Sequence, residues 1–586
     1  MKSQKTFLRK SVALMAMAFM LVSIVSFGQT KVQELDALLG LYTQYGQFNG
    51  SVLVAEKGKV VYKKGFGLAN MEWDIPNTPD TKHRIGSITK QFTALLIMQL
   101  VAEGKIELQA PVSKYLPEYS KTNGDKITIH QLLTHTSGVP NYTSFPNFFK
   151  DLSRNPHTTN EMVRLFADST LQFTPGTKFT YSNSGYVLLG AIIEKITGKL
   201  YEQVLREKIF NPLAMNNTGF DHHNSILKKR ASGYQKKGST FENAPYIDMS
   251  TPHAAGSLYS TVEDLYKWDQ ALYTEKLLPK NYMDMMYQAY IPAFGQHYGY
   301  GWSVGKMEIG TSKDSVQVIG HSGGINGFNT LITRMPNEKS SVILLDNTGD
   351  GELNDITIAI AGILYNKAYE LPKESLASKM YSTILDKDLQ AGLAFFEKHK
   401  NSEDYVLKES DMNSIGYSLL RSDKLNEAEA VFKLNVAQFP KSSNVYDSYG
   451  EVLMNLGKND LAIANYKKSI ELNSANENGI DMLKKLGVET NNLIPEVKVP
   501  ETILEEYVGR YELMPGFILT VTKEGTQLKT QATGQSQVDV FPKSNTVFYL
   551  KVVAAQITFN QNEAGKTESL TLLQGGQEIT GKKLPE

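Results

Sequence analysis

Residues 87–90 read Ser-Ile-Thr-Lys, and the interpretation of the whole chain starts from this stretch. From Phe92 to Val101 the sequence carries apolar side chains at helical spacing, and Gly104 marks the predicted end of that helix. A serine at the start of a helix with a lysine three residues later places a hydroxyl and an ammonium group on one face. A desolvated lysine has a lowered pKa, so Lys90 can help to remove the proton of a nucleophilic Ser87.

The same Ser-x-x-Lys spacing occurs at Ser225 and Lys228 and again at Ser303 and Lys306, so the pattern alone does not select Ser87. A second element, Tyr181-Ser182-Asn183, is the one Tyr-x-Asn sequence in the chain. A tyrosine near a lysine can shuttle a proton, and an asparagine amide can bind a substrate carbonyl. A buried structural tyrosine is the alternative interpretation.

The third element is His321-Ser322-Gly323-Gly324, which lies between two β-rich runs. A strand edge at this place can pair with an acylamide substrate, and its glycines allow a close approach. His297-Tyr298-Gly299 also matches His-x-Gly, so this element is weak when it is taken alone.

In this order and spacing, the three elements resemble the serine β-lactamase and DD-peptidase superfamily. The similarity is greatest to its class C β-lactamase and DD-carboxypeptidase branch, which also includes esterases. Residues 132–140 (LLTHTSGVP), 255–261 (AGSLYST) and 320–324 (GHSGG) carry the same resemblance. It covers residues 35–370 and implies an α/β fold with an antiparallel sheet flanked by helices.

The resemblance also implies a role for each matched residue. Ser87 is the acylated nucleophile, Lys90 eases its deprotonation, and Tyr181 relays protons to the leaving group and activates the deacylating water. Asn183 binds the substrate amide, and the backbone N–H groups of Ser87 and Gly324 form an oxyanion hole. The substrate's carboxylate side meets His321 and Ser322, beside Gly323. Neither a metal nor an organic cofactor is implied.

One residue departs from the pattern of the β-lactam-hydrolysing members, most of which carry a lysine where this chain has His321. Neutral imidazole dominates at pH 7 unless a neighbour raises its pKa, so a permanent cation for a substrate carboxylate is missing. This favours a peptidase, amidase or esterase over a dedicated β-lactamase. D-Ala-D-Ala-type peptides, β-lactams and small esters are the expected substrates, with β-lactams either hydrolysed or trapped as the acyl-enzyme.

The N-terminus predicts a signal peptide over residues 1–28. Four basic residues within the first ten precede an apolar stretch, and Ser26-Phe27-Gly28 gives a small-x-small cleavage pattern. A membrane anchor is the alternative, although the apolar run is short for a span of about 20 residues. We therefore expect an exported protein, periplasmic or secreted, with a catalytic domain over residues 30–370. Within this domain the sequence predicts, among other elements, a strand over 298–304 and an apolar helix over 353–365.

Residues 375–490 repeat with a period of 34, which predicts tetratricopeptide-like helical repeats. Flanking helices over 382–400 and 477–486 are expected as caps, and generic helical hairpins are the alternative. Residues 497–586 contain short alternating runs with glycine-containing turns, which predict a small, barrel-like antiparallel β domain. The residue pairs that are 34 apart are Gly416 and Gly450, Leu419 and Leu453, Ala428 and Ala462, and Phe432 and Tyr466.

Composition excludes several classes of function. The 586 residues include 61 basic and 61 acidic side chains, and this zero net charge argues against a nucleic-acid-binding protein. The chain has no cysteine, which excludes disulfides, cysteine-ligated zinc and a cysteine nucleophile.

Three rival interpretations remain. Residues 301–305 (GWSVG) match the nucleophile elbow of α/β-hydrolases, but residues 306–310 predict strand and turn where that motif needs a helix. His222-His223 could bind a metal, although adjacent loop histidines are more often exposed to solvent. Finally, the catalytic body could be an inactive peptidoglycan- or peptide-binding protein whose repeats recruit an envelope partner; the intact Ser87 and Lys90 argue against this.

Overall fold

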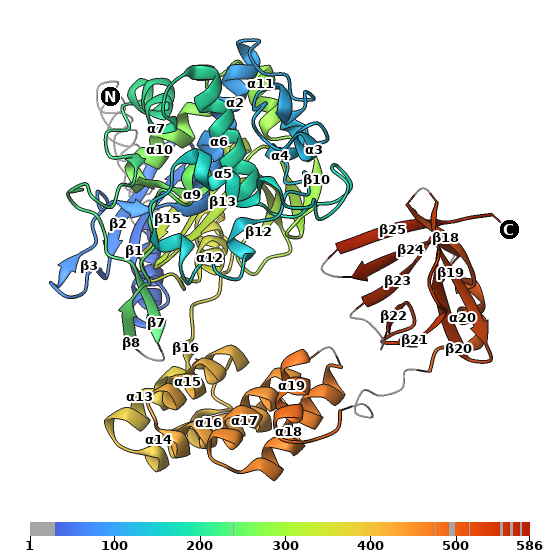
Figure 1. The fold of residues 1–586 in the computed structure, drawn as a ribbon. Helices are drawn as coiled ribbons and strands as arrows, with labels where there is room; N and C mark the ends of the chain where they lie inside the picture. Colours follow the sequence, from blue (N-terminus) through green and yellow to red (C-terminus); the bar gives the residue numbers. More distant parts are fainter. Residues whose placement is uncertain are drawn as a thin grey trace, which may run out of the picture. The chain divides into compact units, whose positions relative to one another are not determined.

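The structure is a computed structural model that describes residues 30–586 apart from 238–239, 475, 491–497, 515, 551–554, 563–565, 575–576 and 586. The predicted signal peptide, residues 1–28, lies outside the described residues. The chain divides into two compact units (Figure 1). The first runs to Ser375 and includes Ser402–Val406, and the second contains Leu376–Asn401 and the chain from Leu407 onward. Within the described part, no helix has the length and apolar character needed to cross a membrane.

An eight-stranded antiparallel sheet forms the centre of the first unit, with the strand order β10-β11-β12-β13-β14-β15-β1-β2. The early hairpin β1–β2 joins the late strand β15, with Gly50 opposite Asp346. The strands are β1 (Gly50–Glu56), β2 (Lys59–Phe66), β10 (Ile291–Ala293), β11 (Gln296–Tyr298), β12 (Ser303–Glu308), β13 (Ser315–Ile325), β14 (Phe328–Met335) and β15 (Ser340–Asp346).

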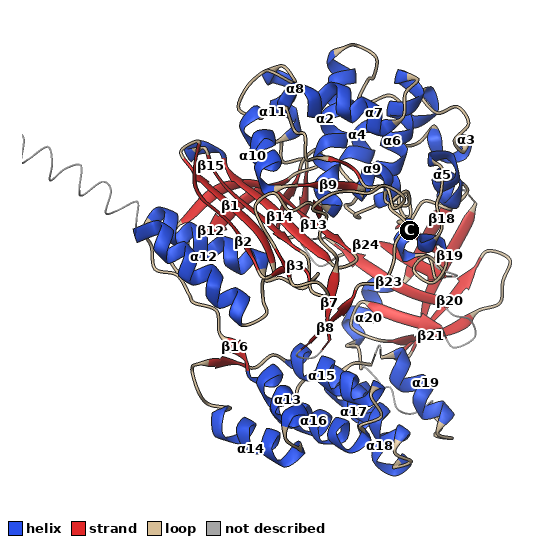
Figure 2. Cartoon of the chain, turned by 90° about the vertical axis from the view of Figure 1, so that its left-hand side faces the viewer, coloured by secondary structure: helices blue, strands red, loops and turns tan. Residues whose placement is uncertain are grey.

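Helices cover both faces of this sheet because its central strands are apolar on both sides; every residue of β15 is buried. Leu344 and its neighbours on one face pack with α12 (Leu353–Tyr365). Ile343 and the other face pack against a layer that includes α2 (Thr89–Ala102) and α6 (Asn183–Thr197). Figure 2 shows α12 on one side of the sheet and α2 and α6 on the other. The predicted α/β fold with an antiparallel sheet flanked by helices is confirmed.

Helix α2 is the central helix of the larger helical layer. All residues from Thr89 to Met98 are buried, as expected for a helix that lies inside a core and is not amphipathic. Trp268 stacks on Phe92 at 4.3 Å between ring centroids, and its indole N–H donates to Gln91. These contacts fix the N-terminal part of α2, which contains Lys90 and directly follows the turn that carries Ser87.

Two details of the predicted secondary structure are wrong. The single strand expected over 298–304 is divided by a turn over 299–302, between the end of β11 and the start of β12. In this turn the N–H of Gly299 donates to the carbonyl of Trp302, and Gly301 has a φ of +77°. The helix expected over 382–400 is two helices, α13 (Leu376–Asp386) and α14 (Leu389–His399). Asp388 separates them because its side chain accepts a hydrogen bond from the N–H of Ala391 and caps a new helix.

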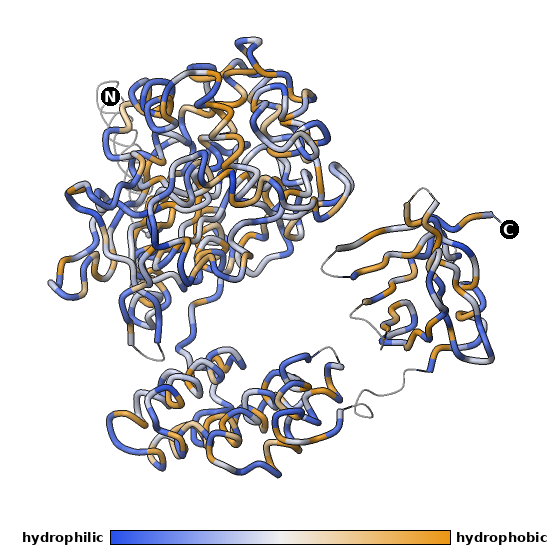
Figure 3. The backbone as a smooth tube through the Cα atoms, viewed as in Figure 1, coloured by the Kyte–Doolittle hydropathy of each residue, from blue (hydrophilic) through white to orange (hydrophobic). Residues whose placement is uncertain are grey.

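The helical part of the second unit contains two hairpins of like construction: α15 (Glu409–Arg421) with α16 (Leu425–Gln438), and α17 (Ser443–Asn455) with α18 (Asn459–Leu472). A Cβ atom on Gly416 would come within 2.6 Å of the Phe432 ring, and one on Gly450 within 3.0 Å of the Tyr466 ring. The 34-residue repetition thus places a glycine against an aromatic ring in each hairpin. Hydrophilic and hydrophobic residues alternate along these helices (Figure 3). Their assignment as tetratricopeptide repeats stays a prediction.

After α19 (Glu477–Lys485) and the short α20 (Glu501–Tyr507), eight strands form a closed antiparallel barrel. This agrees with the predicted small β domain. The barrel strands are β18 (Gly509–Met514), β19 (Phe517–Glu524), β20 (Gln527–Ala532), β21 (Val538–Pro542), β22 (Val547–Leu550), β23 (Ala555–Gln561), β24 (Thr567–Gln574) and β25 (Gln577–Lys583).

Candidate active site

Ser87 lies in a single 3-10 turn, Gly86–Ile88, through which the chain enters α2. Gly86 has a φ of +48°, a conformation that residues with a Cβ atom rarely adopt. A Cβ at this position would also come within 2.9 Å of the carbonyl oxygen of Gly324. Gly86 therefore allows the turn that carries Ser87 to lie directly against β13, which brings the first and third sequence elements together.

The amine of Lys90 has three oxygen neighbours. Its Nζ atom lies 3.1 Å from Oγ of Ser87, 2.8 Å from Oδ1 of Asn183 and 2.8 Å from the carbonyl oxygen of Ala255. The side chain is completely buried, and burial lowers the pKa of Lys90 well below its ordinary range. The two amide oxygens can only accept hydrogen bonds, so they use both N–H groups of a neutral amine. Its lone pair then faces the Ser87 hydroxyl, as a general base requires.

The phenol of Tyr181 lies beside this pair. The Nζ atom of Lys90 is 4.7 Å from the centroid of the Tyr181 ring. Burial raises the pKa of Tyr181 above its ordinary value, and the nearby Ser87 hydroxyl opposes that shift. Within the described residues, the Tyr181 hydroxyl makes no hydrogen bond of normal geometry. A neutral, buried hydroxyl of this kind can donate to a substrate atom or a water molecule next to Ser87.

His135 holds the segment that carries Tyr181. Its carbonyl accepts a hydrogen bond from the N–H of Thr180 (2.9 Å), and its Nδ1 accepts one from the N–H of Ser182 (3.1 Å). The His135 ring lies 4.2 Å from the Tyr181 ring, between centroids. Burial lowers the pKa of His135, so the imidazole is neutral and Nδ1 remains an acceptor. His135 belongs to the 132–140 stretch that carries the family resemblance, and that motif is the sequence signal for its structural role.

Asn183 and its neighbour Asn141 close one side of the site. The side-chain oxygen of Asn183 is occupied by Lys90, and its Nδ2 lies 3.3 Å from Oδ1 of Asn141. The backbone N–H of Asn183 donates to the same oxygen (3.2 Å). Asn141 directly follows the 132–140 stretch, but a loop asparagine has no distinguishing sequence pattern, so its part in the site could not be predicted.

Strand β13 passes the site with one edge open. Strand β12 pairs with residues 315–320 of β13, whereas residues 321–325 pair with β14 alone among the described strands. The backbone of the His-Ser-Gly-Gly element is therefore available for hydrogen bonds with an extended ligand. The Ser322 side chain is exposed there, while His321 and Gly323 point into the fold.

His321 is held by two contacts within the protein. Its Nδ1 lies 2.5 Å from the carbonyl oxygen of Ser322, and because a carbonyl can only accept, Nδ1 carries the ring proton. The Nε2 atom then accepts a hydrogen bond from the Tyr298 hydroxyl (2.8 Å). Burial and, secondly, the nearby Lys90 lower the pKa of His321 to about 4. The imidazole is neutral at physiological pH and both its nitrogens are occupied.

A groove of about 450 Å³ begins at His321 and Ser322 and continues along β12–β14 to the start of α12. Its side chains are mixed in character, with both charged and apolar groups. The lining residues are Phe294, Gln296, Tyr298, Ser303, Lys306, Met307, Glu308, Val318, Gly320, His321, Ser322, Leu331, Thr333, Asn354, Thr357 and Ile358.

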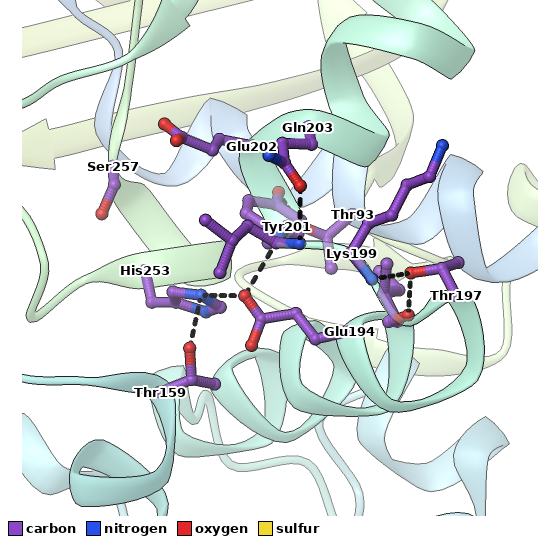
Figure 4. Close-up of polar contacts among 12 residues, drawn as sticks. Thr93, Thr159, Glu194, Thr197, Lys199, Tyr201, Glu202, Gln203, His253 and Ser257 are labelled. Atoms are coloured by element: carbon purple, nitrogen blue, oxygen red, sulfur yellow. Dashed lines mark hydrogen bonds and ion pairs between the residues drawn. The ribbon is translucent and has the colours of Figure 1, made fainter.

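A second layer of polar contacts fixes the carbonyl of Ala255, which belongs to α9 (His253–Gly256). The Nε2 atom of His253 lies 3.2 Å from Oγ1 of Thr159 and 3.5 Å from Oε1 of Glu194 (Figure 4). The hydroxyl of Thr93, which lies one turn after Lys90 on α2, donates to the carbonyl of Ala254 (2.7 Å). These bonds join α9 to α2 and α6, so the carbonyl stays beside the buried amine. A backbone carbonyl has no side-chain signature, so sequence reasoning missed it.

Of the rival sites, the nucleophile elbow is contradicted. Ser303 starts β12, and the chain after it is strand, not helix. Its Oγ donates to Gln296. An α/β-hydrolase also needs an acid after the elbow, and Asp314, which follows it in the sequence, pairs with Lys367. Across the part of the chain that the structure describes, no three histidine, aspartate or glutamate side chains are grouped to hold a metal ion.

The two adjacent glycines of β13 make a matched pair for mutation. A Cβ on Gly323 would lie 2.0 Å from the carbonyl oxygen of Ile85 and 2.5 Å from Oγ1 of Thr330, whereas one on Gly324 meets nothing within 4 Å. Gly323→Ala should therefore displace β13 from Ser87 and slow acylation by about 10²-fold, with a lower Tm. Gly324→Ala should keep the wild-type Tm. Acylation kinetics and thermal unfolding check this, and equal Tm values for the two variants would contradict it.

A buried Ser-Lys pair at the start of a central helix, beside a tyrosine and the open edge of an antiparallel sheet, defines a serine hydrolase. The sequence profile of the family described as Beta-lactamase matches residues 29–365, and the chain belongs to that family. The predicted superfamily is thereby confirmed. Residues 494–583 match a second profile, which is described as a domain of unknown function, DUF3471.

Known proteins similar to this chain include penicillin-binding proteins and an amidase. The "Putative penicillin-binding protein PbpX" of Bacillus subtilis (strain 168) is 30% identical over 344 residues, which cover 58% of this chain and 80% of that protein. The D-amino acid amidase from Ochrobactrum anthropi SV3, solved with L-phenylalanine, is 27% identical with a TM-score of 0.51 and covers 57% of this chain and 99% of that one. The octameric penicillin-binding protein homologue from Pyrococcus abyssi covers 94% of this chain and 99% of that one at 23% identity and a TM-score of 0.51, which supports the fold alone.

Proposed function

We propose that this serine hydrolase is exported and cleaves D-Ala-D-Ala-type peptides, related amides or small esters through an acyl-Ser87 intermediate. The observation that carries the proposal is the position of the buried Lys90 Nζ atom, 3.1 Å from Oγ of Ser87 and 2.8 Å from each of two amide oxygens. In the neutral amine these two oxygens accept both N–H groups, and the lone pair is left for Ser87. The similarity to penicillin-binding proteins and to a D-amino acid amidase supports this substrate class. The predicted signal peptide supports export.

In the first half of the reaction, the Ser87 oxygen attacks the substrate carbonyl while its proton passes to Lys90. The backbone N–H groups of Ser87 and Gly324 stabilise the developing oxyanion. The leaving group then departs with a proton delivered through the Tyr181 hydroxyl, and the acyl-enzyme remains. In the second half, water gives up a proton through Tyr181 and Lys90 and attacks the ester carbon, which releases the acid and restores Ser87.

Two features favour peptides, amides and esters over a dedicated β-lactamase function. His321 is neutral and buried, so it offers no permanent positive charge to the carboxylate of a β-lactam. The open edge of β13 offers backbone groups that can pair with an extended acylamide. Ser322, exposed on that edge, is in position to contact the substrate on its carboxylate side.

Tyr181→Phe should lower turnover by about 10²–10⁴-fold, because the variant keeps the ring but removes the hydroxyl that transfers protons. Steady-state kinetics with an ester substrate, together with the rate of acyl-enzyme decay, measures the effect. The Tyr186→Phe variant is the matched control, since its phenol donates to the carbonyl of Leu133 (3.0 Å) and not to the Ser87–Lys90 pair. A Tyr181→Phe enzyme with wild-type turnover would exclude the phenol from proton transfer.

The function is tested by intact-mass analysis after exposure to penicillin and, separately, to a fluorophosphonate, with Ser87→Ala alongside. A stable penicillin adduct that the variant lacks indicates a penicillin-binding DD-peptidase. A fluorophosphonate adduct at Ser87 without a penicillin adduct indicates an esterase or amidase, or rapid β-lactam turnover, which a hydrolysis assay detects. No adduct with either reagent would contradict the proposal and favour an inactive peptide-binding protein.

A further inference from the structure

The interior of the C-terminal barrel is filled at one end and open at the other. Inward and outward side chains alternate along each strand, as in other barrels. At the filled end, Tyr507 from α20 stacks on Phe559 with 4.0 Å between ring centroids and a 2° interplanar angle. Phe548 packs edge-on against Phe559 at 5.5 Å, and Tyr511 does so at 6.1 Å. This aromatic layer forms a solid floor inside the barrel.

Above that floor the inward side chains include small ones. Thr530 and Ala532 follow each other on the inner face of β20, and Ala555 lies on the inner face of β23. A cavity of about 380 Å³ remains in this half of the barrel, within the size range of small-molecule sites. Every strand from β19 to β25 contributes to its wall. The lining residues are Phe517, Leu519, Thr530, Ala532, Gln535, Ser536, Val538, Leu550, Ala555, Ile557, Leu572, Gln574 and Ile579.

The chemistry of the wall limits what the cavity can bind. None of these lining residues is charged, and most are aliphatic. Gln535 and Ser536 lie in the connection between β20 and β21, and Gln574 ends β24, so polar groups gather where strands end. An ion placed in such a cavity would lose its hydration without a compensating charge, which excludes strongly charged ligands from the apolar part.

We propose that the barrel binds one small, uncharged, largely apolar molecule in this cavity, with any hydrogen-bonding end group at the polar mouth. Eight-stranded barrels have an interior that side chains can fill or that can hold one small ligand. In this barrel the aromatic floor is filled, while the small residues above it leave the space open. A ligand would restore the dispersion contacts that the wall lacks. This binding site is separate from the hydrolytic chemistry and does not depend on Ser87.

The test uses the full chain and the neutral fluorescent probe N-phenyl-1-naphthylamine. The expected result is saturable binding with one probe per chain. Ala532→Phe, which fills the cavity, should weaken binding at least tenfold. Gln531→Phe is the matched control, because this adjacent residue of β20 is exposed on the outer face, and it should bind the probe like the wild type. Ala555→Leu provides an independent filling variant, and circular dichroism verifies that each variant is folded.

Several results would overturn the proposal. These are the absence of saturable binding to the wild-type chain, or equal binding to folded Ala532→Phe and Gln531→Phe variants. If the probe no longer binds after penicillin has acylated Ser87, or after a fluorophosphonate has phosphonylated it, the probe site lies at the active centre, which also contradicts the proposal. The hydrolytic function is measured separately, by acylation of Ser87. A failure of the proposed ligand binding therefore does not imply a failure of the proposed hydrolytic function, and the reverse also holds.

Discussion

Ser87→Ala should reduce turnover of a peptide or ester substrate by about 10⁴–10⁶-fold and abolish covalent labelling. The variant keeps the buried amine and the open strand edge but has no oxygen to form the acyl-enzyme. Any residual rate then comes from substrate binding and the oxyanion hole, which act without the nucleophile. Measured kcat and intact mass after labelling report the two effects separately. Because Ser87 is half-buried and its hydroxyl lies at hydrogen-bonding distance from Lys90, the substitution removes little packing and should leave Tm nearly unchanged.

The matched control is Ser303→Ala, since Ser303 lies in the rival nucleophile-elbow sequence and also precedes a lysine by three residues. Ser303 starts β12, and its Oγ donates to Gln296 of β11 and not to the Ser87–Lys90 pair, so this variant should keep covalent labelling. Retained turnover in Ser87→Ala, or lost labelling in Ser303→Ala with an unchanged Tm, would refute the assignment of Ser87.

Lys90→Met should slow acylation by about 10²–10⁴-fold, because methionine fills much of the same space but cannot accept the Ser87 proton. The pH dependence gives a sharper test. Burial lowers the pKa of Lys90, and the deprotonated amine is the active form, so the wild-type acylation rate should fall as the pH decreases through that pKa. This acidic limb of the profile should be absent from the residual activity of Lys90→Met.

His321→Gln is the control for the pH profile. The pKa of His321 is lowered to about 4, so this residue is already neutral where enzyme assays are normally made. Its replacement should therefore leave the position of the acidic limb unchanged, whatever its effect on the absolute rate. If the acidic limb persists in Lys90→Met and is lost in His321→Gln, the group that titrates is His321 and not Lys90. This result would refute Lys90 as the base.

Local patterns in the sequence determined the elements of the site. The Ser-x-x-Lys spacing depends on helix geometry over three residues, and the two side chains meet at 3.1 Å. The apolar run over 353–365 predicted α12 with the bounds that the structure has, because periodicity within one helix depends on nearby residues. The order of the three motifs was enough to identify the family. The prediction of one strand over 298–304 was wrong because the chain turns at Gly299 and Gly301.

Only the tertiary structure decided what surrounds Lys90. Asn183 is 93 residues away in sequence and the Ala255 carbonyl 165, so neither contact follows from local spacing. The fold also turned His321 inward to Tyr298 and placed His135 between the two backbone N–H groups that flank Tyr181. The sequence supplied the reactive groups, whereas burial sets their protonation. Burial results from packing between segments that are distant in the sequence. The pKa of Lys90 is therefore lowered only once these segments have packed together in the folded protein.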